Sequence, residues 1–241
     1  MRFYYIRHAQ SANNALWDAT GASKGRSEDP DLTDVGRRQA ELLADFVYKT
    51  DAAVAHNGRG ALLKRDFFGF THLYTSLMIR SLHTATMLAS RLQIPLQAWP
   101  EIHEAGGIFL EDEATGEPRG LPGKPRSYFV NHFQGLVLPE SVTEEGWWNR
   151  PFEANEERPL RAKKVLQALL ERHGGTADCV AVVSHGAFYM YLLREIFGIQ
   201  GEKSWFLMNN TGISRIDFEP DGAPVLVYHN RTQHLPEELL T

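Results

Sequence analysis

Four basic side chains follow the ends of apolar, strand-like runs in this sequence. Arg7 and His8 come directly after the run FYYI, and His185 comes directly after the run CVAVVS. Arg80 lies just beyond a third run, THLYTS, on the first turn of an expected helix. Because the carboxyl ends of parallel strands meet at one edge of a sheet, these side chains are expected to converge. Converging cations indicate an anionic ligand, and guanidinium groups beside helix N-terminal amides suit a phosphate.

The residue types at this edge have the chemistry for phosphoryl transfer. The neutral imidazole of His8 would be a competent nucleophile, and a second histidine with two arginines would stabilise charge on the transferred group. The reaction also needs an acid that protonates the leaving oxygen and then activates water. The segment EIHEAGG offers two candidates, Glu101 and Glu104. Arg80 adds a further indication, because the helix dipole disfavours a cation in the first turn unless it has an anionic partner.

Alternating strand and helix patterns supply the elements that would position these residues. Apolar runs predict strands at 3–6, 71–76 and 179–184, and the last is typical of a strand buried on both faces. The polar stretch 9–30 reads as a loop, and Thr33 is the expected N-cap of the helix that follows. Helices are expected at 31–50, 77–93, 157–174 and 185–198, and a hairpin at 212–230. The pattern predicts an α/β fold, a three-layer α/β/α sandwich with a mainly parallel central sheet.

One long segment breaks this alternation. From about 105 to 151 the sequence is rich in Gly, Pro and aromatic residues and shows no clear period. A long irregular stretch inside a compact domain is usually functional, so we interpret it as a specificity insertion, a cap or loop region within a single domain spanning 1–241. Trp147 and Trp148 are expected to pack the insertion on the core. The irregular stretch 51–70 receives no assigned role.

Composition excludes several classes of partner. The 241 residues carry a net charge of −5, without the basic surplus expected of a protein that binds nucleic acid or an anionic membrane. Cys179 is the only cysteine, which excludes an intramolecular disulfide and favours a buried structural thiol. No signal peptide or membrane-spanning pattern appears, so the cytoplasm is the expected compartment.

Five segments, in order along the chain, resemble the signature of a known enzyme family. They are RHAQSANN, DLTDVGRRQA, SLMIRSLHTA, EIHEAGG and VVSHGAF. Together they are similar to the histidine phosphatase superfamily, the group that includes the cofactor-dependent phosphoglycerate mutases. The match covers nearly the whole chain, with Ala9 in the place of a signature glycine and Ser11 in that of a Ser or Thr.

The resemblance assigns roles to particular residues. It implies that His8 is the nucleophile that becomes a phosphohistidine, and that Glu104 is first the proton donor and then the base. It implies that the phosphoryl oxygens are held by Arg7, Asn14, Arg80 and His185. No metal and no other cofactor is implied, and the remaining histidines show no metal-ligand spacing, so they read as structural or exposed.

Departures from the family pattern bear on the reaction. The mutase branch has an arginine after the acid and a Gly-Trp motif soon after the signature, whereas Ala105 follows Glu104 here. The sequence therefore favours a metal-independent phosphomonoesterase acting on a small phosphorylated metabolite. Two alternatives stay open, a phosphoglycerate-type mutase and a non-catalytic phospholigand-binding module. The substrate and the oligomeric state are not assigned.

Overall fold

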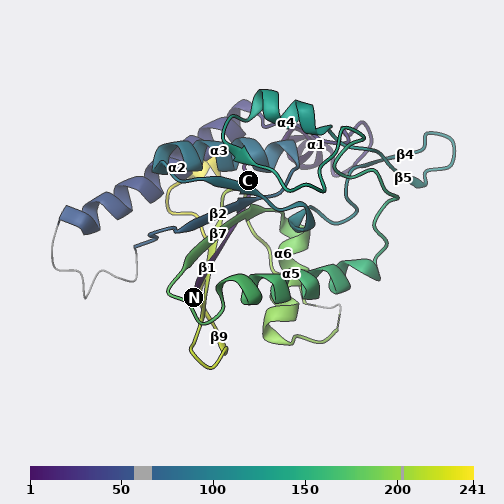
Figure 1. Cartoon of the computed structure of the whole chain (residues 1–241). Coiled ribbons are helices and arrows are strands. Elements are labelled where there is room, and N and C mark those ends of the chain that lie inside the picture. The colour runs from purple at the N-terminus through teal and green to yellow at the C-terminus, as the bar shows by residue number, and fades with distance from the viewer. Residues whose placement is uncertain (57–66, 202–203) are drawn as a thin grey trace.

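The computed structural model describes residues 1–56, 67–201 and 204–241, and these form a central sheet of seven strands (Figure 1). The strand order is β6-β3-β2-β7-β1-β8-β9. Neighbours from β6 to β1 are parallel, whereas β8 and β9 are antiparallel. The strands are β1 (Arg2–Arg7), β2 (His72–Thr75), β3 (Leu96–Ala98), β6 (Leu136–Val137), β7 (Cys179–Ser184), β8 (Ile213–Phe218) and β9 (Pro224–Arg231).

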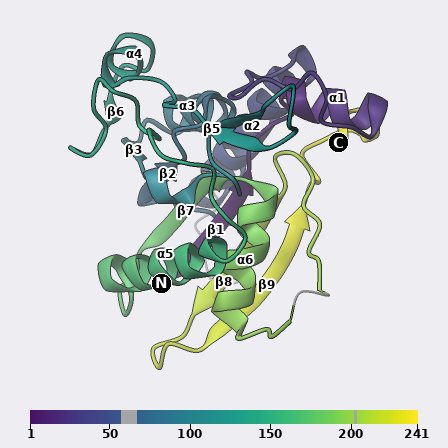
Figure 2. The ribbon, with the colours of Figure 1, turned by 90° about the vertical axis from the view of Figure 1, so that its right-hand side faces the viewer.

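Helices cover both faces of this sheet, as both views show (Figures 1 and 2). One face carries α2 (Asp34–His56) and α3 (Ile79–Leu92), and the other carries α5 (Glu157–His173) and α6 (Gly186–Phe197). Successive residues of β1 alternate between the two cores. Tyr4 and Ile6 pack with α2 and α3, whereas Phe3 and Tyr5 pack with α5 and α6. The predicted three-layer α/β/α sandwich is confirmed.

The sheet order brings the predicted strand ends together. The three strands that end in polar side chains are neighbours, in the order β2-β7-β1. Arg7 is in register with Ser184, and Thr75 is in register with Val183. All six residues of β7 are buried, as expected for a central parallel strand. The predicted C-terminal hairpin is also present, as β8 and β9.

The loop predicted for 9–30 is wrong in part, because α1 (Ala12–Thr20) lies within it. Ser11 is the N-cap of α1, and its hydroxyl accepts a hydrogen bond from the Asn14 N–H. The Asn14 side chain in turn accepts from the Ser11 N–H, which completes a capping box. No residue of α1 is buried, so packing in the core does not account for this helix, and the capping box marks its start.

The segment from 105 to 151 packs on the sandwich and extends its sheet. It contains β4 (Phe109–Glu111), β5 (Pro118–Gly120), α4 (Arg126–His132) and β6, which pairs with β3 at the sheet edge. Trp147 and Trp148 are buried against residues at the start of α3, so the predicted packing of both rings is confirmed.

Other predictions concern short segments and single residues. Two 3₁₀ turns, η1 (Pro100–Ile102) and η2 (Glu237–Leu239), complete the described elements. Much of the unassigned stretch 51–70 lies outside the described residues. Cys179 is a buried free thiol, as predicted. Among the described helices, none is both long and apolar enough to cross a membrane.

Candidate active site

The four basic side chains predicted from the strand ends do converge. The rings of His8 and His185 lie 5.1 Å apart between centroids. Arg80 donates a hydrogen bond from Nε to Nε2 of His8 at 3.1 Å. Arg7 donates from Nη1 to the carbonyl of Met208, which lies 201 residues further along the chain. His8, Arg80 and His185 are all buried, so the charge of the Arg80 guanidinium is poorly screened by water. The arrangement is a compact basic centre at the carboxyl edge of the sheet.

A cavity of about 190 Å³ opens onto this centre. Its lining includes five of the six residues predicted for the site, namely Arg7, His8, Asn14, Arg80 and Glu104. His185 is not among the lining residues and instead packs against His8. Glu101, the other acid candidate, is exposed and lines a different cavity together with Trp148 and Arg150. The geometry therefore favours Glu104 as the acid of this site.

The hydrogen bonds of His8 indicate its tautomer. Nδ1 lies 2.7 Å from the Ala9 carbonyl, which can only accept, so the ring proton is on Nδ1. Nε2 then carries the lone pair that receives the Arg80 bond. Burial, together with the charges of Arg80 and Arg7, lowers the pKa of His8 well below its usual value. His8 therefore presents a neutral imidazole nitrogen beside the cavity.

Ala9, which stands in the place of a signature glycine, is not among the residues with positive φ. Its methyl group is therefore tolerated at this position.

His185 is held by two hydroxyl groups. Its Nε2 lies 2.9 Å from Oγ of Ser76 and 3.3 Å from Oγ of Ser81. Ser76 directly follows β2, and Ser81 lies in the first turn of α3. The Tyr5 hydroxyl accepts from the backbone N–H of His185 at 3.1 Å and fixes the chain at that point. Burial lowers the pKa of His185 well below its usual value, with Arg80 as a second cause. Nδ1 of this neutral ring has no hydrogen-bond partner among the described residues.

Glu104 is held at the N-terminus of α6. Its Oε1 accepts from the N–H groups of Ala105 at 2.8 Å and Phe188 at 3.0 Å, and Oε2 accepts from Ala187 at 3.4 Å. A carboxylate in this place is favoured by the helix dipole and by the unpaired amides of the first turn. The bonds fix its position at the cavity.

Asn14 enters the cavity from α1. Its Oδ1 accepts from the Ser11 N–H at 3.1 Å and from Nδ2 of Asn210 at 3.4 Å. The Oδ1 of Asn210 accepts in turn from Oγ1 of Thr241, the C-terminal residue. These bonds connect α1 to the C-terminus, and the two lie close together in Figure 2. Since the Asn14 oxygen is engaged, its amide NH₂ is the group with capacity left for an anion.

A family comparison identifies the class to which this site belongs. A family model described as the histidine phosphatase superfamily (branch 1) matches residues 3–232. The chain belongs to the histidine phosphatase superfamily. The resemblance predicted from the five segments is therefore confirmed. No curated protein matches the chain in sequence.

Solved structures share the fold of this histidine phosphatase superfamily member. The phosphoserine phosphatase of Entamoeba histolytica, in complex with 3-phosphoglyceric acid, is 22% identical, with a TM-score of 0.57 over 98% of this chain and 99% of that one. A putative alpha-ribazole-5'-P phosphatase of Escherichia coli is 20% identical, with a TM-score of 0.62 over 96% and 97%. A mycobacterial glucosyl-3-phosphoglycerate phosphatase is 15% identical, with a TM-score of 0.56 over 95% and 98%.

Two charged residues of this superfamily member's site were not predicted. Asp29 is buried beside Arg80, with its Oδ1 3.9 Å from Nη1 of Arg80 and accepting from the Ile79 N–H at 3.0 Å. Burial raises the pKa of Asp29 to about 7, against the opposing effect of Arg80. Arg26 lines the cavity, with its guanidinium carbon 4.1 Å from the centroid of the Phe109 ring. The first-turn position of Arg80 was the one sequence signal for an acid such as Asp29.

Proposed function

We propose that the protein is a metal-independent phosphomonoesterase that works through a phosphohistidine. The observation that carries the proposal is the neutral Nε2 of His8, which lies beside a cavity lined by Arg7 and Arg80 and also by Glu104. Nucleophile, charge stabilisers and acid thus share one small space, as phosphoryl transfer to a side chain requires.

The reaction proceeds in two displacements. Nε2 of His8 attacks phosphorus, the P–N bond forms, and the ester P–O bond breaks. Glu104, in its protonated form, gives its proton to the leaving oxygen, so the alcohol departs neutral. In the second step Glu104 takes a proton from water, which attacks the phosphohistidine, breaks the P–N bond and releases inorganic phosphate.

The surrounding donors stabilise the transferred group. Arg7 and Arg80 present guanidinium groups to the phosphoryl oxygens, and the amide of Asn14 assists them. Arg80 gives up its bond to His8 as the phosphoryl group arrives, which frees the Nε2 lone pair for attack. His185 does not line the cavity but packs against His8, and its unpaired Nδ1 would donate to an oxygen of a phosphoryl group bound on His8.

The substrate is proposed to be a small phosphorylated metabolite. The cavity of about 190 Å³ accommodates a phosphoryl group and a small attached molecule. The three similar structures are phosphatases whose names carry small phosphorylated compounds, which supports this class. The segment from about 105 to 151 shapes the choice of substrate, because its Phe109 contacts Arg26 at the cavity.

The structure bears differently on the two alternative functions. A phosphoglycerate-type mutase must hold a second charged group while it returns the phosphate, and Ala105 provides no charge next to Glu104. A non-catalytic phospholigand-binding module has no use for a carboxylate at an anion site, yet Glu104 lines the cavity. Hydrolysis therefore remains the better-supported reaction.

The decisive experiment compares the native protein with His8→Ala in aryl phosphate hydrolysis with excess chelator. His132→Ala is the matched control, because His132 is exposed on α4 and contacts Tyr128 through a hydrogen bond to its carbonyl and through ring stacking. We expect the His8 variant to lose at least 10³-fold in kcat, since the nucleophile is gone, and the control to keep its activity. Rapid quenching without acid should trap labelled phosphate on the native chain and on His132→Ala, but not on His8→Ala. Full turnover by the His8 variant would refute the proposal.

A further inference from the structure

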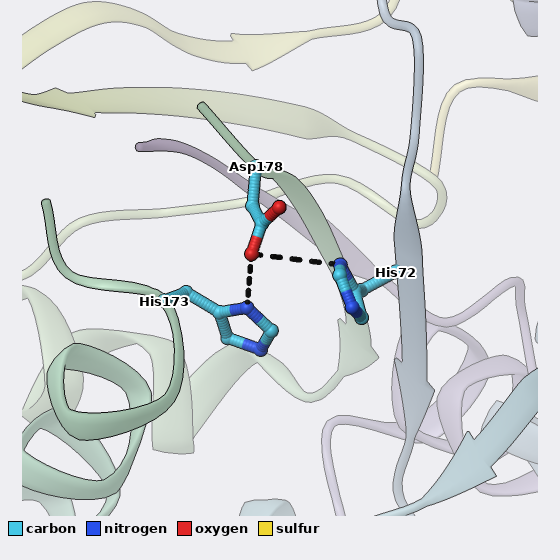
Figure 3. Close-up of side chains that lie close together, drawn as sticks. All are labelled: His72, His173 and Asp178. Atoms are coloured by element: carbon cyan, nitrogen blue, oxygen red, sulfur yellow. Dashed lines mark hydrogen bonds and ion pairs between the residues drawn. The ribbon is translucent and has the colours of Figure 1, made fainter. Parts of the chain in front are cut away.

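A second group of chemically competent side chains lies at the opposite end of the sheet from the cavity. His72 begins β2, His173 ends α5, and Asp178 directly precedes β7. One ring nitrogen of each histidine and one oxygen of Asp178 all lie within 4.8 Å of one another. Figure 3 shows the carboxylate between the two rings, joined to both. This trio is the one set of three potential metal ligands found in the described parts of the chain.

The donor distances are close to those of a transition-metal site. Oδ2 of Asp178 lies 2.8 Å from Nδ1 of His173 and 3.9 Å from Nδ1 of His72. Tetrahedral Zn²⁺ with bonds of 2.0–2.1 Å holds its ligand atoms about 3.3 Å apart. Each of the two distances to Asp178 differs from that spacing by roughly half an ångström, and all three ligand atoms lie within 4.8 Å of one another. Two imidazoles and one carboxylate are a common zinc ligand set.

Surrounding groups already orient the two rings. Nε2 of His173 lies 3.0 Å from the Tyr74 hydroxyl, a bond that keeps Nδ1 turned toward Asp178. Nδ1 of His72 lies 2.9 Å from the Thr71 hydroxyl. That hydroxyl has a second acceptor, the Cys179 carbonyl at 3.2 Å, so it stays paired if His72 turns its nitrogen to an ion.

The three side chains of the trio differ in their exposure to solvent. The His173 side chain is 5% exposed, whereas those of His72 and Asp178 are 32% and 27% exposed. The trio is therefore open to solvent at His72 and Asp178, where a water could serve as the fourth ligand, while His173 is buried.

We propose that His72, His173 and Asp178 bind one divalent transition-metal ion, of which Zn²⁺ is the best match. The ion joins the end of α5 to the starts of β2 and β7 and acts as a structural clamp. Asp178 and His185 flank the six residues of β7, so the ion lies roughly 20 Å from the catalytic centre. Metal-independent hydrolysis at that centre and a bound metal at this site are therefore compatible.

The test uses the full chain without a histidine tag. Zinc titration by calorimetry should give one ion per chain, and Co²⁺ should give the visible absorption of a four-coordinate site. At a hundredfold excess over Kd, Zn²⁺ should raise Tm by about 5–10 °C, because it binds the folded chain only. Chelator should reverse the rise and leave aryl phosphate hydrolysis intact.

Variants assign the site. His72→Ala and Asp178→Asn should each weaken zinc binding at least tenfold, and both alter partly exposed side chains, so the metal-free fold is retained. His132→Ala and His8→Ala should bind zinc like the native chain. The proposal is overturned if the native chain binds no stoichiometric ion. It is also overturned if the first two variants bind normally, or if binding is lost in His8→Ala instead.

Discussion

Replacing Asp29 by asparagine tests the electrostatics around Arg80, which lines the cavity. Asp29 is buried, its Oδ1 caps the Ile79 N–H, and its Oδ2 has no hydrogen-bond partner in the described structure. Asparagine has the same shape and keeps an oxygen for the cap, but it carries no charge at any pH. The substitution therefore removes the titration of this group while leaving the start of α3 in place.

The expected size follows from the pKa of Asp29, which burial raises from 3.8 to about 7. An acid whose pKa is raised by folding binds its proton more tightly in the folded state. Its contribution to stability is thus fully present below pH 4 and is lost as the pH rises to about 7. Each pKa unit corresponds to about 1.36 kcal/mol, so the loss between these limits reaches about 4 kcal/mol. Asp29→Asn should abolish this loss.

The assay is urea unfolding of both proteins at intervals from pH 4 to pH 9. The asparagine variant should gain stability relative to the native chain by up to about 4 kcal/mol between pH 4 and pH 7, with no further gain above. A buried, unpaired asparagine NH₂ adds a constant penalty of about 1–3 kcal/mol, which shifts the curve without changing its slope. Two stability curves that stay parallel throughout would refute the reasoning.

Two further substitutions probe the acid and the helix packing beside the site. Glu104→Gln should lower kcat by about 10²–10⁴-fold, and more for phenyl phosphate than for 4-nitrophenyl phosphate, because the poorer leaving group depends more on protonation; equal losses would contradict the acid role. Gly36→Ala should destabilise the protein by about 1–3 kcal/mol in urea unfolding, since a Cβ on α2 would lie 2.0 Å from the Gln10 carbonyl oxygen. An alanine variant as stable as the native chain would show that this contact relaxes freely.

The features that the sequence predicts are those carried by local patterns. The runs FYYI and CVAVVS are apolar because they become β1 and β7, the central strands of the sheet. Once those strands are placed, the positions of Arg7, His8 and His185 follow from the geometry of parallel sheets. Family membership depends on the same segments and is confirmed by the match to residues 3–232.

The features that the sequence does not reveal depend on long-range contacts. Helix α1 contributes no buried residue to the core, and the Ser11 and Asn14 that form its capping box are also common loop residues. The trio of His72, His173 and Asp178 joins three elements whose adjacency appears only when β2 pairs with β7. Strand β6 extends the sheet from inside a segment with no clear pattern.

Asp29 shows how such a long-range contact changes the interpretation of a local signal. The helix dipole disfavours a cation in the first turn, so the position of Arg80 predicts an anionic partner. The partner expected from the sequence was a phosphate. The structure places Asp29 there, so Arg80 already has a carboxyl partner before any ligand arrives. A pKa of about 7 leaves that partner only partly ionised at neutral pH, so it satisfies Arg80 incompletely. Under the proposed mechanism, a phosphoryl group entering the cavity would take over the guanidinium and add negative charge beside Asp29, which favours protonation of Asp29. Asp29 would then stabilise Arg80 in the empty site and lose its charge when the substrate engages that arginine.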